Sequence, residues 1–140
     1  MASDPFNLQR FVDAQDRLYD RVLSELRRGE KTSHWMWFIF PQLRGLGHSP
    51  TAVIYGISSR EEAQAYLRHP ILGARLREGT SLVNVIKGRS LAKIFGYPDD
   101  LKFKSCMTLF ALAAPEESAF KDALEKYCGR EMDKRTVELL

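Results

Sequence analysis

The sequence predicts an all-α protein, built as one compact, irregular bundle of about five to eight short helices. Apolar residues recur at intervals of three and four along most of the chain, and helix caps and helix breakers separate these segments. Only residues 53–57 (VIYGI) favour a strand. The chain has 140 residues, of which 44% are hydrophobic, which is enough for one core. We therefore expect a single helical domain over residues 1–140.

The N-terminal segment predicts the longest helix. Asp4 followed by Pro5 can open it and Gly29 can close it. Its inward face carries four apolar residues at helical spacing: Phe11, Leu18, Val22 and Leu26. A short apolar helix is then expected after the capping residues 31–33, ending at Pro41.

Helix starts recur through the middle of the chain. Residues 42–48 (QLRGLGH) contain two glycines and are typical of a loop, and Ser-Pro at 49–50 then starts a short helix through residue 55. Ser59 and Glu62 form a capping box for a helix that ends before His69-Pro70. Pro70 fits the first turn of the helix that follows.

The C-terminal third predicts four further helical segments. Ser90 can cap a turn through residue 95, and either Asp99 or Asp100 can cap a helix that Pro115 ends. A helix around residues 120–128 ends before a glycine, and residues 133–140 predict a capped terminal turn or two. Segments this short are weak helices in isolation, so tertiary packing must stabilise them.

The formal net charge of +3 is spread along the chain, so no specific nucleic-acid binding is expected. The basic residues in segments 27–31 and 75–93 fit solvated helix faces, with a phosphate-bearing small molecule as the alternative partner. Cys106 and Cys128 lack metal-ligand spacing, which predicts free thiols in a reducing cytosol, no metal site and no cofactor. The N-terminus lacks signal-peptide features, and no apolar run approaches the roughly 20 residues of a membrane span. We expect a soluble cytoplasmic protein without a membrane partner; its oligomeric state stays open.

Residues 33–42 (SHWMWFIFPQ) are the most informative stretch. The segment is either the most hydrophobic element of the core or one wall of a ligand pocket. Seven successive apolar residues cover every side of a short helix, so some of them must be enclosed or face a cavity. Each indole N–H also needs a partner when buried. Trp35 and Trp37 are therefore candidates for stacking a flat ring.

The polar residues at the ends of this stretch are the other candidates. His34 can sit in a first helical turn, where the helix dipole favours a neutral imidazole that relays a proton; it is equally well a surface residue. Gln42 can offer a donor and an acceptor to a ligand. Arg44, or the loop through Gly47 and His48, could meet a phosphate, although turn geometry alone also explains the two glycines of GLGHS.

Carboxylates for hydrolytic chemistry are few. Asp133 fits a helix cap with Thr136, or the buried carboxylate that would activate water. Glu61, Glu62 and Glu78 are further carboxylates, with Glu62 already assigned to a cap. His69, next to Pro70, is better explained by a backbone hydrogen bond than by chemistry.

Several stretches resemble one known family in order and spacing. These are residues 33–49 (SHWMWFIFPQLRGLGHS), A-x-x-Y-x-I at 52–57, EAQAYLRHPILGARL at 62–76, FGYPDDLKFKSCMTLF at 95–110 and D-x-x-T-x-x-L-L at 133–140. The sequence closely resembles the domain of unknown function 1810, a family of small helical bacterial proteins sometimes labelled calpastatin-like. That label carries no weight here, because the inhibitor uses disordered repeats and this chain has the composition of a compact domain.

The chain is also similar, in general character only, to the NADAR superfamily, whose members process ADP-ribose-linked or related ribosyl compounds. This resemblance implies a hydrolase that cleaves an N-glycosidic bond in a nucleotide or ADP-ribose-type ligand. Judged from this chain's own residues, Trp35 or Trp37 would stack the base, His34 and Gln42 would hold polar edges, and Asp133 would activate water, so His34 and Asp133 are the candidate catalytic residues. The alternative is a non-catalytic module that binds a small ligand or a protein through residues 33–42. No catalytic residue is carried over from this analogy, which is of fold type alone.

Overall fold

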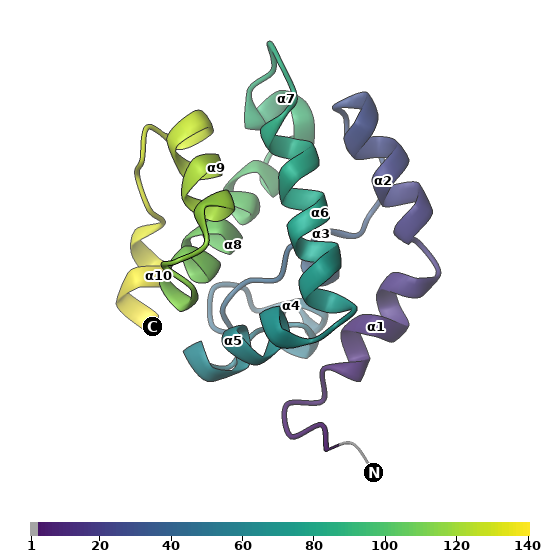
Figure 1. Cartoon of the computed structure of the whole chain (residues 1–140), viewed down its shortest axis with the longest axis vertical. Coiled ribbons are helices and arrows are strands. Elements are labelled where there is room, and N and C mark those ends of the chain that lie inside the picture. The colour runs from purple at the N-terminus through teal and green to yellow at the C-terminus, as the bar shows by residue number, and fades with distance from the viewer. Residues whose placement is uncertain (1–2) are drawn as a thin grey trace.

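The protein forms ten helices in residues 3–140, which the computed structural model describes (Figure 1). The helices are α1 (Gln9–Asp16), α2 (Tyr19–Arg28), α3 (Met36–Ile39), α4 (Pro50–Ile54), α5 (Arg60–Arg68), α6 (Leu72–Asn84), α7 (Leu91–Phe95), α8 (Asp99–Ala113), α9 (Ser118–Cys128) and α10 (Lys134–Leu139). Within this part of the chain the extended residues make only an isolated parallel bridge between Leu43 and Ile57. The all-α prediction is confirmed, and the number of helices is slightly above the expected range.

One additional helix comes from the N-terminal segment, which is two helices instead of the one expected up to Gly29. The helical ladder breaks at Leu18, whose N–H donates to the Gln15 carbonyl at 3.0 Å. α1 packs against α3, whereas α2 packs against α6 (Figure 1). A single straight helix cannot lie along both neighbours, so packing overrides a continuous apolar stripe.

Buried Gln15 secures this break. Its Nε2 donates to the Phe38 carbonyl at 2.7 Å and to the Tyr66 hydroxyl at 3.0 Å. With 1% of its surface exposed, Gln15 is a core amide whose donors are paired.

Four expected caps are present. The side chains of Ser49, Ser59, Ser90 and Asp133 accept backbone N–H bonds at the starts of α4, α5, α7 and α10. These caps are local, with acceptor and donor three residues apart, which explains why the sequence shows them. The Ser59 box is incomplete, because the Glu62 carboxylate accepts from the N–H and hydroxyl of Ser58 instead of Ser59.

Two expected caps are absent. α8 begins at Asp99 after Pro98, so Asp99 and Asp100 lie inside its first turn, where carboxylates favour the positive end of the helix dipole. α3 begins at Met36 without a side-chain cap, because the Ser33 hydroxyl donates instead to Glu25.

α8 is the centre of the core. It packs against α5, α7, α9 and α10, and most of its side chains are buried, including Phe103 and Phe110. Phe40 and Phe95 close around Phe103, with ring centroids 5.0 and 4.9 Å from it. Such aromatic contacts add to the apolar area that holds these short helices together.

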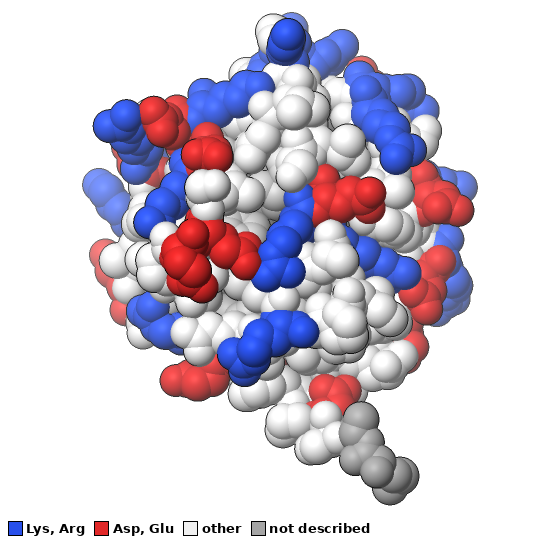
Figure 2. Space-filling view, viewed as in Figure 1, with Lys and Arg blue, Asp and Glu red and all other residues white. Residues whose placement is uncertain are grey.

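None of the helices in residues 3–140 combines the length and the apolar character needed to cross a membrane. On the face seen in Figure 2, basic and acidic side chains are interspersed over most of the surface.

Candidate functional site

The stretch 33–42 forms α3 and the two chain segments that flank it. Its two indoles differ sharply in environment: Trp35 is 1% exposed, whereas Trp37 is only half-buried. Because neighbouring residues of a helix point in different directions, one indole enters the core while the other reaches the surface. The segment is therefore part core and part surface.

Trp35 is held by a buried carboxylate. Its indole Nε1 donates to Glu25 Oε1 at 3.0 Å, and the same carboxylate accepts the backbone N–H groups of Thr32 and Ser33 at 2.7 and 3.0 Å. Burial raises the pKa of the Glu25 carboxyl, but the bonds from Ser33, Thr32 and Trp35 outweigh it and lower the pKa from 4.5 to about 2. This placement favours the core-packing alternative for Trp35 and leaves Trp37 as the indole available to a ligand.

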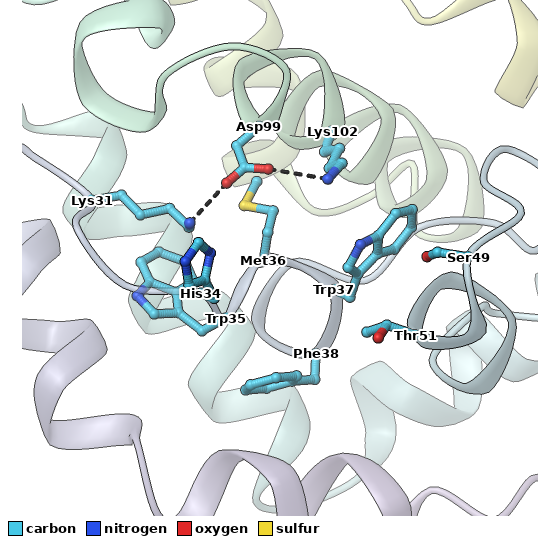
Figure 3. A pocket seen from close by; sticks show the side chains of 10 residues that line it. All are labelled: Lys31, His34, Trp35, Met36, Trp37, Phe38, Ser49, Thr51, Asp99 and Lys102. Carbon is cyan, nitrogen blue, oxygen red and sulfur yellow. Dashed lines mark ion pairs between the residues drawn. The ribbon is translucent and has the colours of Figure 1, made fainter.

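The first surface hollow at the stretch, here the His34 hollow, measures about 370 Å³ and is lined by His34, Trp37, Lys31, Asp99 and Lys102, among others. Figure 3 shows Asp99 between the two ammonium groups, at 2.7 Å from Lys31 Nζ and 3.2 Å from Lys102 Nζ. Burial raises the pKa of Asp99, but the hydrogen bonds and charges of Lys31 and then Lys102 hold it below its usual value. The hollow thus carries one carboxylate and two ammonium groups.

A second hollow, here the Gln42 hollow, shares Trp37 and Lys102 with the first and measures about 240 Å³. Four of the residues singled out from the sequence line it together: Trp37, Gln42, Gly47 and Asp133. Lys102, Ser105 and Arg135 complete its polar lining. The fold has brought residues 37 and 133, almost a hundred positions apart, to one cavity.

Gln42 is the most unusual member of this group. Its side chain is buried, with 2% exposed, yet Nε2 has no hydrogen-bond partner among the described residues. Its carbonyl accepts the Ile57 N–H at 2.8 Å, which fixes the backbone beneath the side chain. An unpaired buried donor lowers the free energy of unfolding by about 1–3 kcal/mol, so a partner supplied from the hollow would be stabilising.

The Trp37 indole forms a wall common to the two hollows, together with Lys102, whose Nζ lies 4.8 Å from the ring centroid. Gly47 permits this arrangement. A Cβ at position 47 would stand 2.8 Å from Trp37 Cη2 and 2.9 Å from the Ala52 Cβ, closer than side chains tolerate. The second glycine of GLGHS is therefore explained by packing against the indole.

Asp133 serves as the cap of α10. Its Oδ2 accepts the Thr136 N–H at 3.0 Å and the Thr136 hydroxyl at 2.5 Å, which leaves Oδ1 outside the cap. His34 is exposed and lines the other hollow. The two residues proposed from the sequence as a catalytic pair therefore line different hollows, which have Trp37 in common.

Arg44 and His48 line neither hollow and are exposed. Arg44 donates from Nη2 to the Gly56 carbonyl at 3.2 Å, which ties the 42–48 loop to the segment after α4. Sequence reasoning overlooked Lys102 and Arg135 as lining residues; the only local signal was the Asp99–Lys102 pair at i and i+3, which is typical of a helix surface. Among residues 3–140 no three His, Cys, Asp or Glu side chains gather as a possible metal site.

Comparisons with known proteins place the chain. The model of a family described as protein of unknown function (DUF1810) matches residues 5–140. The crystal structure of the conserved hypothetical protein Rv1873 from Mycobacterium tuberculosis is 61% identical, with 98% of each chain covered and a TM-score of 0.97. A comparison with curated proteins finds no match. Because the family model covers nearly every residue, the chain belongs to the DUF1810 family, as the motif around Trp35 and Trp37 indicated.

Proposed function

We propose that this protein binds a small nucleotide-type ligand at the Gln42 hollow. The observation that carries the proposal is that Gln42, whose buried Nε2 has no hydrogen-bond partner among the described residues, lines a cavity together with the half-buried indole of Trp37. Rotation of the amide would turn Nε2 from its buried position toward the hollow, where a ligand carbonyl, ring nitrogen or sugar oxygen would accept from it. A flat ring would pack against Trp37, because indole faces stack nucleobases with little dependence on sequence.

The remaining lining residues suit the other parts of such a ligand. Lys102 and Arg135 carry positive charge for a phosphate, and Ser105 lies beside them. The hollow, at about 240 Å³, is slightly below the usual range of ligand pockets, so it fits one ring or sugar. The His34 hollow, which shares Trp37, offers space for a second part, as an ADP-ribose-type ligand would require.

The test compares two buried glutamines. Gln42→Met removes the unpaired amide but keeps an unbranched side chain of similar length. We expect the ligand-free variant to melt at the same temperature as the wild type or higher, because the unsatisfied donor is gone. Gln15→Met is the matched control, and it should lower the melting temperature because the amide donors of Gln15 are paired.

The readout is the thermal shift given by AMP, ADP and ADP-ribose. The wild type should show a saturable rise in melting temperature with at least one of them, and Gln42→Met should show none. The proposal is refuted if the wild type responds to no member of the panel. It is also refuted if Gln42→Met is as destabilised as Gln15→Met, because Gln42 would then be a structural residue.

The catalytic form of this proposal is hydrolysis of an N-glycosidic bond, and it is favoured by the position of Asp133 at the same hollow as Gln42 and Trp37. Water would add to the anomeric carbon of the ribosyl group, its proton passing to Asp133, while the C–N bond breaks and its electron pair leaves with the base. His34, which lines the adjoining hollow, would contact the other part of the ligand.

Asp133→Asn separates the catalytic form from binding alone. Asparagine caps helices as well as aspartate, so the fold should persist. Loss of base release with an unchanged ligand-induced thermal shift supports hydrolysis. Binding by the wild type without any released base supports the non-catalytic alternative, a binding module that uses residues 33–42.

A further inference from the structure

A third hollow, here the basic hollow, lies between the C-terminal end of α2 and the loop that follows α6. It measures about 460 Å³, and four of its lining residues are cationic: Arg27, Arg28, Lys87 and Arg89. None of the described residues that line it is acidic. The loop is at the top of Figure 1, and Figure 2 shows Lys and Arg side chains gathered around that end.

Close packing at Gly29 fixes the two segments against each other. Gly29 adopts φ +75°, and a Cβ there would stand 3.4 Å from Arg89 Cδ and 3.5 Å from Ile86 Cγ2. The loop after α6 thus closes directly over the end of α2. Cations from two separate parts of the sequence are thereby placed around one concave space.

Basic residues at a helix C-terminus often serve only to satisfy its last carbonyls. At the end of α2 other groups do this. The carbonyls of Leu26 and Glu25 accept the N–H groups of Gly29 and Glu30 at 3.0 and 3.1 Å. These two carbonyls therefore do not need Arg27 or Arg28 as caps.

The carbonyl groups at the C-terminal end of α6 also have hydrogen-bond donors, which are side chains of α9. Lys126 Nζ donates to the carbonyls of Asn84 and Ile86 at 2.6 Å each, and the Tyr127 hydroxyl donates to the Val83 carbonyl at 2.5 Å. Lys87 and Arg89 are consequently not required to cap α6.

The charge of the basic hollow is not compensated from within. None of its four cations forms an ion pair with the described residues. The two helix ends contribute about half a negative charge each, against four full positive charges. Glu30 is exposed beside Gly29 but does not line the hollow. A positive potential therefore remains in the cavity.

We propose that the basic hollow binds a small soluble polyanion that carries two or more phosphate groups. Guanidinium and ammonium groups are strong donors to phosphate oxygens, and converging cations favour a ligand whose charges are close together. The concave shape distinguishes this site from the extended basic stripe expected for a nucleic acid. The site is separate from the Gln42 hollow and does not depend on the function proposed for it.

Isothermal titration calorimetry with inorganic tripolyphosphate tests the proposal on the full chain. We expect saturable binding that weakens with added salt. The double variant Lys87→Gln/Arg89→Gln should bind roughly ten-fold more weakly or worse, since two charge-assisted contacts to the phosphate groups are lost. Both residues are exposed in a loop, so circular dichroism should show an unchanged fold.

The matched control is Arg68→Gln/Lys134→Gln, which removes the same two charges from exposed positions on α5 and α10. It should bind tripolyphosphate within about two-fold of the wild type, because only screened long-range attraction is lost. Equal weakening in both double variants would show a non-specific charge effect and overturn the proposal, as would absence of saturable binding by the wild type.

Two further arms identify the source of the phosphate groups. One arm titrates a short single-stranded RNA, and the other titrates vesicles of phosphatidylcholine with phosphatidylserine. Both arms use the wild type and the Lys87→Gln/Arg89→Gln variant. If either binds through these residues while tripolyphosphate does not compete, the small-molecule proposal is overturned. Gln42→Met should leave tripolyphosphate binding unchanged, which keeps this result independent of the Gln42 hollow.

Discussion

Glu25 offers the sharpest test of the packing around α3. The residue is 2% exposed, and its carboxylate accepts bonds from the N–H of Thr32, the N–H and hydroxyl of Ser33 and the indole of Trp35. Glu25→Gln keeps the shape of the side chain but removes its charge and turns one acceptor into a donor. The new amide N–H would face groups that are donors themselves.

The pKa shift sets the magnitude. Because the Glu25 pKa falls from 4.5 to about 2 on folding, the ionised group contributes about 3 kcal/mol to the free energy of unfolding at pH 7. A depressed pKa means that this contribution is complete above pH 4.5 and is lost as the pH falls toward 2. At pH 3 about 1.4 kcal/mol should remain.

Urea unfolding followed by tryptophan fluorescence at pH 7 and pH 3 measures this contribution. The difference in unfolding free energy between wild type and Glu25→Gln should be about 3 kcal/mol at pH 7 and shrink by about half at pH 3. Glu116→Gln, at an exposed position, is the control and should match the wild type at both values. A Glu25→Gln difference that does not change with pH would refute the reasoning.

Three further substitutions test the site. Trp35→Ala should lower the free energy of unfolding by about 3–5 kcal/mol in urea titrations. Trp37→Ala should lower it by clearly less, because of the two indoles only that of Trp35 is fully buried. Equal losses would contradict the assignment of Trp37 to the surface. Gly47→Ala should cost about 1–3 kcal/mol in the same assay and shift the Trp37 fluorescence, because the new Cβ overlaps the indole. Asp133→Ala should lower the free energy of unfolding by about 0.5–2 kcal/mol through loss of the helix cap, whereas Asp133→Asn should stay close to the wild type. An equal loss in both variants would show that Asp133 stabilises the fold mainly through its charge and not through capping.

Much of the fold was predictable because its signals are local. Ser49, Ser90 and Asp133 cap helices through atoms three residues away, and Gly129 ends α9 in the left-handed conformation. The split between α1 and α2 was not predictable, because Leu18 continues the apolar stripe of the sequence. Its cause is that the two halves pack against different partners, α3 and α6, far along the chain.

The candidate site shows the same division. Residue type and position drew attention to Trp37, Gln42, Gly47 and Asp133, and the fold gathers all four at one hollow. The sequence could not separate Trp35 from Trp37, because two indoles of a short helix have equal apolar character. The difference depends on Glu25, which lies on another helix.

The sequence by itself determined the helical class, most helix boundaries and the family, because periodicity, caps and motifs are properties of neighbouring residues. Only the tertiary structure decided which polar groups are left without partners. Gln42 Nε2 is unpaired because of what surrounds it, and the cations around Gly29 share one cavity because the loop after α6 folds back on α2. Burial and convergence are relations between distant segments, so they exist only once the chain has folded.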